Sequence, residues 1–445
     1  MTTNLIHTLT RPLLCAAAAM AVASAPAHAG IDIQHWQDGS GARVFFVESR
    51  ALPMVDIQID FAAGGAYDPP ARAGLAGFTR SLLDAGTAEL DEQAVADRIA
   101  DLGAQFGGGT DDDRASLALR SLSSAAELDA AVDLAATLLA RPAFPAAVLE
   151  RERERAIAGL REALTRPDVL AARAFTAAVF GDHPYGLQGT PESLAAITRD
   201  ELADFHRRHY TAARATVTIV GDVDRAQAAD IATRLLAALP AGEPASALPQ
   251  PVQPARQTLR IAHPSAQAHV AIGLPGMSRE DPDYYPLLVG NYVLGGGGFV
   301  SRLTREVREK RGFAYSVFSY FAPRAVAGPF QIGLQTRGGQ VEDALAVVND
   351  TLAAFIADGP SEEEMEAARA NIINGFGLRL DSNRKILDHV AMIGFYGLPL
   401  DWLDTYPGHV AAVSAEAVRD AFARRVRSEH LITVVAGGDG DEARP

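Results

Sequence analysis

An internal duplication constrains the fold of this chain more than any other feature of its sequence. Residues 195–221 align without a gap to residues 411–437. In each segment a hydroxyl residue, Thr198 or Ser414, stands where the N-cap of a helix belongs, and the helical pattern leads to a β-branched strand that ends at glycine. The sequence therefore predicts two similar halves that each end in a helix and a strand.

A proline-rich segment separates these halves. Five prolines lie between Pro240 and Pro254 among Ala, Gly, Ser and Gln, which is the composition of an extended linker. A chain of 445 residues is also too long for one ordinary core. We therefore expect an N-terminal domain over 30–239, a linker over 240–256 and a C-terminal domain over 257–440.

Strands and helices are grouped along each half rather than alternating. In the first half, strand composition covers 43–47, 55–61 and 115–122, and helical patterns cover 124–140, 145–164 and 169–179. This order predicts the α+β class, with two homologous sandwich domains in which helices cover one face of a mainly antiparallel sheet. Two such domains would enclose a space, as one half of a clamshell.

The first 29 residues have the pattern of a secretory signal peptide. Arg11 precedes an apolar run from Pro12 to Ala25, and Ala27-His28-Ala29 is a small-residue cleavage site. Cys15, the only cysteine, lies in this run, where its neighbours match a lipid attachment site poorly. Cleavage would leave no thiol for a disulfide, a metal site or a nucleophile. No later segment has the roughly 18 apolar residues of a membrane span. We therefore expect a soluble periplasmic protein.

The charge balance narrows the choice of partners. The chain has 40 basic and 55 acidic residues, which gives a formal net charge of −15. This excess of negative charge argues against nucleic acid and anionic membranes as partners and favours a basic peptide.

The stretch from Gly295 to Tyr315 combines a glycine loop, a basic helix and an aromatic strand. The loop is a candidate contact surface because glycine permits sharp turns and close approach; it consists of Gly295, Gly296, Gly297 and Gly298, followed by Phe299. Apolar spacing at Val300, Leu303 and Val307 predicts a helix over 300–311 that Gly312 ends, and a strand follows. On composition alone, a solvated charged helix before an ordinary core strand is the preferred interpretation.

Four sequence markers give the chain a family resemblance. They lie at 74–87, 183–186, 219–222 and 295–315, in that order. Together with the duplication, they resemble the insulinase/pitrilysin metallopeptidase family over residues 31–440. In size the chain is similar to the subunits of mitochondrial processing peptidase and their bacterial relatives.

The resemblance breaks at the zinc motif. Catalytic members carry His-x-x-Glu-His on one helix, where two histidines bind zinc and the glutamate activates water. The matching positions here are Gly77, Arg80 and Ser81, which cannot do this chemistry. The third ligand should fall at 157–159, where no acid stands, and whether Arg80 pairs with the flanking Glu154 or Glu162 is left open. We therefore expect no metal on this chain.

Two histidine motifs offer weaker alternatives. His206 and His209 have a spacing that can bind a metal, but no cysteine and only scattered acids accompany them, so the end of a helix is the preferred interpretation. His183, in His-Pro-Tyr-Gly, is expected to form a structural turn between helices.

The second half keeps what the family uses to hold substrate. The family's arginine and tyrosine match Arg308 and Tyr315, and the glycine loop resembles the loop with which non-catalytic subunits touch substrate. A guanidinium can donate to peptide carbonyl oxygens, and a phenol can donate to the oxyanion of the transition state. The resemblance implies a non-catalytic subunit that acts on extended or unfolded peptides together with a homologous, zinc-bearing partner. The alternative is an inactive scaffold or peptide-binding protein.

Overall fold

The computed structural model describes residues 30–438. Every helix and strand below belongs to one compact unit that begins at Asp32. The predicted signal peptide lies outside the described residues. Within residues 30–438, no helix combines the length and apolar character that crossing a membrane requires.

The first half contains a six-stranded sheet. Its strands are β1 (Gln34–Gln37), β2 (Arg43–Glu48), β3 (Met54–Phe61), β4 (Gln105–Gly107), β5 (Ala115–Leu122) and β6 (Ala215–Gly221), in the spatial order β1-β2-β6-β3-β5-β4. Its helices are α1 (Leu75–Ser81), α2 (Glu92–Asp101), α3 (Ala125–Ala140), α4 (Ala146–Ala163), α5 (Pro167–Phe180), α6 (Pro191–Ala195), α7 (Arg199–His209) and α8 (Arg225–Leu236). Only β2 and β6 pair in parallel.

The second half repeats this plan with five strands. These are β7 (Gln257–Ile261), β8 (Gln267–Met277), β9 (Ala314–Phe321), β10 (Gly328–Arg337) and β11 (Ile432–Gly437), in the spatial order β7-β11-β8-β10-β9. The helices are α9 (Tyr284–Asn291), α10 (Val341–Asp358), α11 (Glu362–Phe376), α12 (Asn383–Tyr396), α13 (Trp402–Ala411) and α14 (Ala415–Arg425). Here β7 and β11 form the parallel pair.

The duplication is visible in both sheets. Thr198 caps α7 and Ser414 caps α14, each by accepting a hydrogen bond from a backbone N–H of the first helical turn. The strand that follows, β6 or β11, lies between one parallel and one antiparallel neighbour in its sheet. The predicted α+β class, with mainly antiparallel sheets, is therefore confirmed.

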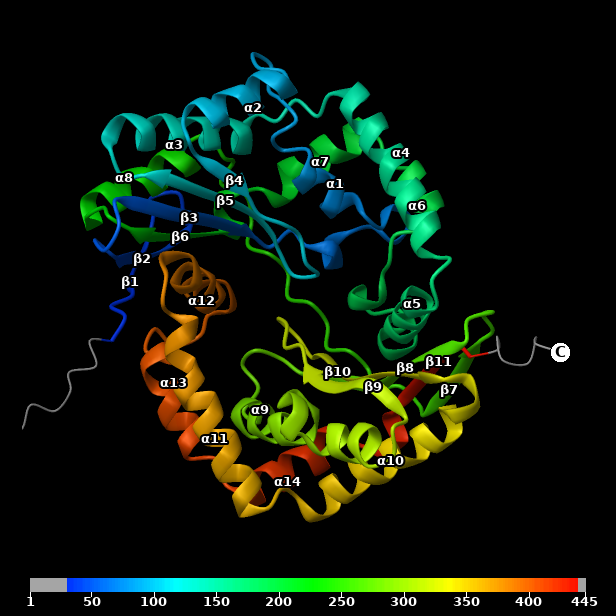
Figure 1. The fold of residues 1–445 in the computed structure, drawn as a ribbon. Helices are drawn as coiled ribbons and strands as arrows, with labels where there is room; N and C mark the ends of the chain where they lie inside the picture. The colour runs from blue at the N-terminus through cyan, green and yellow to red at the C-terminus, as the bar shows by residue number, and fades with distance from the viewer. Residues whose placement is uncertain (1–29, 439–445) are drawn as a thin grey trace, which may run out of the picture. The chain divides into compact units, whose positions relative to one another are not determined.

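Each sheet also receives a helix from the opposite half on its second face. Phe45 of β2 points away from the core that contains its neighbours Val44 and Phe46. Its ring packs against Gly394 of α12, so closely that a Cβ on this glycine would lie 2.7 Å from the ring. In the second half, a Cβ on Gly273 of β8 would lie 2.9 Å from Phe175 of α5. Helices α5 and α12 thus cross between the halves (Figure 1).

A buried carboxylate joins the halves. Asp113 accepts hydrogen bonds from the hydroxyl of Tyr185, from the hydroxyl of Tyr396 at 2.9 Å and from the backbone N–H of Ala325 at 2.9 Å. Tyr185 belongs to the His-Pro-Tyr-Gly motif, so this motif serves the contact between halves. In this motif, Nδ1 of His183 accepts a hydrogen bond from the Tyr185 N–H, and Nε2 lies 2.8 Å from the Pro249 carbonyl oxygen. His183 therefore lies in a structural turn.

The proline-rich segment contains no helix or strand, and both halves hold it. Ala212 N–H donates to the Pro240 carbonyl at 2.9 Å, and Gln253 donates to the Pro275 carbonyl at 2.9 Å. His430 Nδ1 lies 2.8 Å from the Pro254 carbonyl oxygen. These contacts, with the crossing helices and the buried carboxylate, make the two halves one packed body.

Candidate functional site

The degenerate zinc motif lies on α1. Gly77 and Ser81 are exposed, whereas Arg80 is buried. The Arg80 guanidinium donates to the backbone carbonyls of Ser116 and Gly107. The question left open by the sequence is thereby answered, because Arg80 bonds carbonyl oxygens rather than a glutamate.

These residues do not fit a zinc ion. Positions 77 and 81 offer no imidazole, and the fixed positive charge of Arg80 lies where the family places its general base. Among the described residues, no group of three or more His, Cys, Asp or Glu side chains could hold a metal ion. No step that needs a metal on this chain follows from the structure.

The two histidines at the end of α7 serve packing. Nε2 of His206 lies 2.7 Å from the Leu139 carbonyl oxygen, and the ring stacks on Tyr210. Burial lowers the pKa of His206. His209 stacks on Phe205, and burial together with the cation of Arg214 lowers its pKa to about 4. Both rings are therefore parts of the helix end, as the preferred interpretation predicts.

Arg308 and Tyr315 come together in the second half. The guanidinium carbon of Arg308 lies 4.8 Å from the ring centroid of Tyr315 and 4.9 Å from that of Phe299. Both rings are exposed, at 83% for Tyr315 and 69% for Phe299. The two faces hold the guanidinium in place and leave its N–H edges free to donate.

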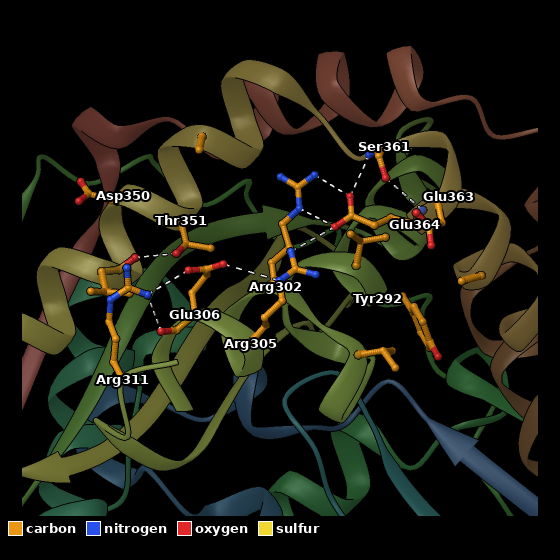
Figure 2. A pocket seen from close by; sticks show the side chains of 15 residues that line it. Tyr292, Arg302, Arg305, Glu306, Arg311, Asp350, Thr351, Ser361, Glu363 and Glu364 are labelled. Carbon is orange, nitrogen blue, oxygen red and sulfur yellow. Dashed lines mark hydrogen bonds and ion pairs between the residues drawn. The ribbon is translucent and has the colours of Figure 1, made fainter. Parts of the chain in front are cut away.

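Arg308 differs from its cationic neighbours in having no acidic partner among residues 30–438. Arg302 pairs with Glu364 at 2.6 Å, and Glu306 accepts from Lys310 at 2.8 Å and Arg311 at 2.9 Å. Arg302, Glu306, Arg311 and Glu364 line a pocket of about 660 Å³ (Figure 2), and Arg308 is not among its lining residues. Arg308 is thus a cation available to a ligand.

The Arg302–Glu364 pair anchors this segment to α11. Burial raises the pKa of the Glu364 carboxyl, but hydrogen bonds from Arg302 and from the Ser361 backbone, with nearby positive charge, lower it overall to about 2. Arg302 also donates to the Gly359 carbonyl at 2.9 Å. The anchor fixes the segment that presents Arg308.

The glycine loop is tighter than the sequence indicates. Gly295 and Gly296 end a π-helix, Tyr292–Gly296. Gly295 is buried and packs so closely on β9 that a Cβ there would lie 2.5 Å from the Ser319 nitrogen. Gly297 is half-buried, and only Gly296 and Gly298 are exposed; Gly298 has a left-handed backbone, with φ of +62°. The exposed part that could meet a ligand is therefore Gly296, Gly298 and Phe299.

The predicted helix over 300–311 is only partly correct. A 3₁₀ turn, Gly298–Val300, precedes it, and the regular part is a π-helix, Thr304–Glu309. Leu303 and Val307 are buried as predicted, but Val300 is exposed because it precedes the helix. Single π-turns inside helices are frequent at functional sites.

Strand β9 completes the site. A pocket of about 310 Å³ lies between it and the glycine loop, and Phe318 and Tyr320 line this pocket together with Arg308. The sequence analysis identified Tyr315 but not these two aromatic residues. Their two-residue spacing on a strand, which places them on one face, was the available signal.

Comparison with known proteins agrees with this picture. A model described as Insulinase (Peptidase family M16) matches residues 43–189, and one described as Peptidase M16 inactive domain matches residues 196–372. The chain belongs to the insulinase (M16) family. It is 30% identical over 356 residues to an uncharacterized zinc protease of Mycobacterium leprae, covering 77% of this chain and 78% of that protein.

Two further M16 relatives resemble this chain over most of its length. The crystal structure of a peptidase M16 inactive domain from Pseudomonas fluorescens has a TM-score of 0.88 and 36% identity, covering 92% of this chain and 98% of that one. A protein of Helicobacter pylori described as a non-peptidase homolog, YmxG, is 25% identical and covers 85% of this chain and 87% of that protein. With Gly77, Arg80 and Ser81 at the motif positions, the chain is an inactive-type M16 member.

Proposed function

We propose that this chain is the non-catalytic subunit of a heterodimeric zinc peptidase. It holds an extended peptide through Arg308 and Tyr315 while a homologous partner provides the zinc and the general base. The Arg308 guanidinium donates to carbonyl oxygens of the peptide, and the Tyr315 hydroxyl donates to the oxyanion formed when water attacks. The chain itself contributes no metal.

The observation that carries this proposal is the free cation of Arg308. An arginine held between two exposed aromatic rings, without an acid, beside a pocket, suits a ligand with oxygen acceptors. Its neighbour Arg302 is instead paired with Glu364. The extended peptide would lie on a sheet edge of the partner by β-augmentation.

Access for the peptide would come from movement between subunits. The two halves of this chain share crossing helices and the buried Asp113, so separating them would uncover both helices and break the hydrogen bonds that Asp113 accepts from Ala325 and Tyr396. Opening between this chain and its partner requires no such loss, and it can admit unfolded peptides as lids and domains do in other enzymes.

The test is to combine the purified chain with a zinc-bearing M16 partner and measure peptide hydrolysis. We expect turnover by the mixture and none by either protein alone. Arg308→Ala and Tyr315→Phe should lower turnover while the complex still forms, as judged by size-exclusion chromatography. Hydrolysis by the isolated chain that a chelator abolishes would refute the proposal.

The second candidate is an inactive scaffold or peptide-binding protein. The likeness to a non-peptidase homolog favours it. One result distinguishes the two functions. If this chain is only a scaffold, a complex assembled with the Arg308→Ala variant should hydrolyse peptides as fast as a complex assembled with the wild-type chain.

The proposed compartment is the periplasm, on the basis of the signal-like pattern of the first 29 residues. Cell fractionation and N-terminal sequencing test this. We expect a periplasmic protein that begins at Gly30.

A further inference from the structure

Exposed aromatic residues gather at one place on this chain. The sequence has 18 Phe, 10 Tyr and 2 Trp, all within residues 30–438, and only four of these side chains are exposed. They are Phe299, Tyr315, Phe318 and Tyr320. Clusters of exposed aromatic side chains mark binding surfaces, because leaving them in water is unfavourable.

Two of the four lie side by side on strand β9. The rings of Phe318 and Tyr320 are stacked, with centroids 6.1 Å apart and an interplanar angle of 18°. Tyr320 donates from its hydroxyl to Gln331 at 2.8 Å. Phe318 lies opposite Gly333 in β10, where a Cβ would come within 2.5 Å of the tip of its ring. The glycine thus lets the ring lie across the neighbouring strand.

This aromatic surface continues a sheet face that is covered elsewhere. Gln331 lies opposite Gly273 of β8, and Gly333 lies opposite Ala271. At Gly273 and Ala271, α5 packs on this face through Phe175. Phe318 and Tyr320, further along the same face, are 42% and 38% exposed.

The edge of β9 beside this surface is partly closed. Asn291 donates to the Ser319 carbonyl at 3.1 Å, so the backbone of Ser319 faces the outer edge of the sheet and is occupied there. Phe318 and Tyr320, on the strand beside this capped edge, line the pocket that Arg308 also lines. Recognition at this point therefore depends on side chains.

We propose that Phe318 and Tyr320 form a subsite for an aromatic side chain of the bound peptide. The inference rests on the proposed function, since it places a peptide at Arg308. One pocket presents a cation for the peptide's carbonyl oxygens and two stacked rings for one of its side chains. Aromatic side chains gain from stacked and edge-to-face contacts beyond the area they bury, and aliphatic ones do not.

The test uses the mature full chain alone and fluorescent peptides that differ only at one central position, which is Phe, Leu, Ala or Asp. Binding is measured by fluorescence anisotropy. We expect the Phe peptide to bind about tenfold more tightly than the Ala peptide. Leu should fall between them, and Asp should gain nothing over Ala.

Two variants connect this preference to the subsite. Phe318→Ala combined with Tyr320→Ala should reduce the Phe-to-Ala ratio to about twofold or less. Gly333→Ala, which keeps both rings but displaces Phe318, should reduce it as well. Leu400→Ala is the control, because Leu400 is also exposed and lies outside the pocket, and its ratio should equal the wild-type value.

Equal affinity for the Phe and Ala peptides, equal affinity for Phe and Leu, or no saturable binding up to about 1 mM would overturn the subsite. An unchanged ratio in the double variant would do the same. Failure of the proposed function gives a different result, namely heterodimer turnover that is insensitive to Arg308→Ala while the Phe preference of the isolated chain persists.

Discussion

Arg308 and Tyr315 lie on opposite sides of a single left-handed turn, and this turn brings the guanidinium carbon to 4.8 Å from the ring centroid. Gly312, with φ of +65°, follows the π-helix, which ends at Glu309, and redirects the chain into β9. The pair is therefore built by local geometry. Its function depends on the shape of the cation as much as on its charge.

Arg308→Lys should separate these two properties. Lysine keeps the charge but lacks the planar fork that stacks between two rings and donates along its edge. We expect kcat/KM of the assembled heterodimer to fall about tenfold with lysine and more with alanine, because hydrogen bonds to charged groups contribute about 1.5–3 kcal/mol. Steady-state peptide hydrolysis measures this. Equal activity of the lysine variant and the wild type would contradict a stacked, donating role.

Stability should depend on pH through Glu364. Its folded pKa is about 2, below the ordinary value of 4.5, so the carboxylate contributes stability above pH 4.5 that is lost as the pH falls toward 2. Glu364→Gln should lower the free energy of unfolding at pH 7 by about 2 kcal/mol and flatten its slope in that acid range. Urea denaturation at several pH values measures both.

The matched control is Glu342→Gln, since Glu342 pairs with Arg260 on the surface. Such exposed pairs contribute about 0–1 kcal/mol. If the two glutamine variants lost the same stability, Glu364 would not be the anchor described above.

Removing the Asp113 carboxylate should loosen the contact between halves. Asp113→Ala leaves the buried Tyr185 hydroxyl without its acceptor, at a cost of about 1–3 kcal/mol, and also removes the acceptor of the partly buried Tyr396 hydroxyl and Ala325 N–H. We expect a loss of several kcal/mol in urea denaturation and faster hydrogen exchange in α12. Tyr396→Phe should cost about 1 kcal/mol, and Tyr320→Phe, whose hydroxyl is on the surface, less than about 0.5 kcal/mol. Unchanged exchange in α12 would contradict this account.

Arg80→Met should destabilise the turn after β4. The partly buried hydrogen bonds from the Arg80 guanidinium to the Ser116 and Gly107 carbonyls would be lost, and hydrogen bonds to charged groups contribute about 1.5–3 kcal/mol. Hydrogen exchange around residues 107–116 should increase, whereas Arg98→Met, at an exposed position on α2, should leave it unchanged. Greater stability in Arg80→Met would mean that burying the guanidinium is a net cost.

The sequence predicts features that depend on near neighbours. Thr198 and Ser414 cap their helices, because capping involves only one turn of backbone. The spacing around Val300 is less informative, since a π-turn shifts which residues face inward.

Features that depend on distant partners could not be predicted. Arg80 is unsuited to zinc by its chemistry alone, but its carbonyl acceptors lie on the hairpin that contains Gly107 and Ser116. Likewise, the helical pattern over 169–179 predicts α5 without indicating which sheet this helix covers. The pairing of Phe318 with Gly333 requires the register of β9 against β10.

The reciprocal placement of α5 and α12 has a consequence for how this protein can be divided. A fragment that stops at the linker would keep α5 without the sheet it covers and would expose Phe45 where α12 belongs. We therefore expect that neither half folds well without the other, despite the repeat that relates them. Gene truncations at the linker should therefore yield insoluble pieces, whereas co-expression of the two pieces should allow them to reassemble.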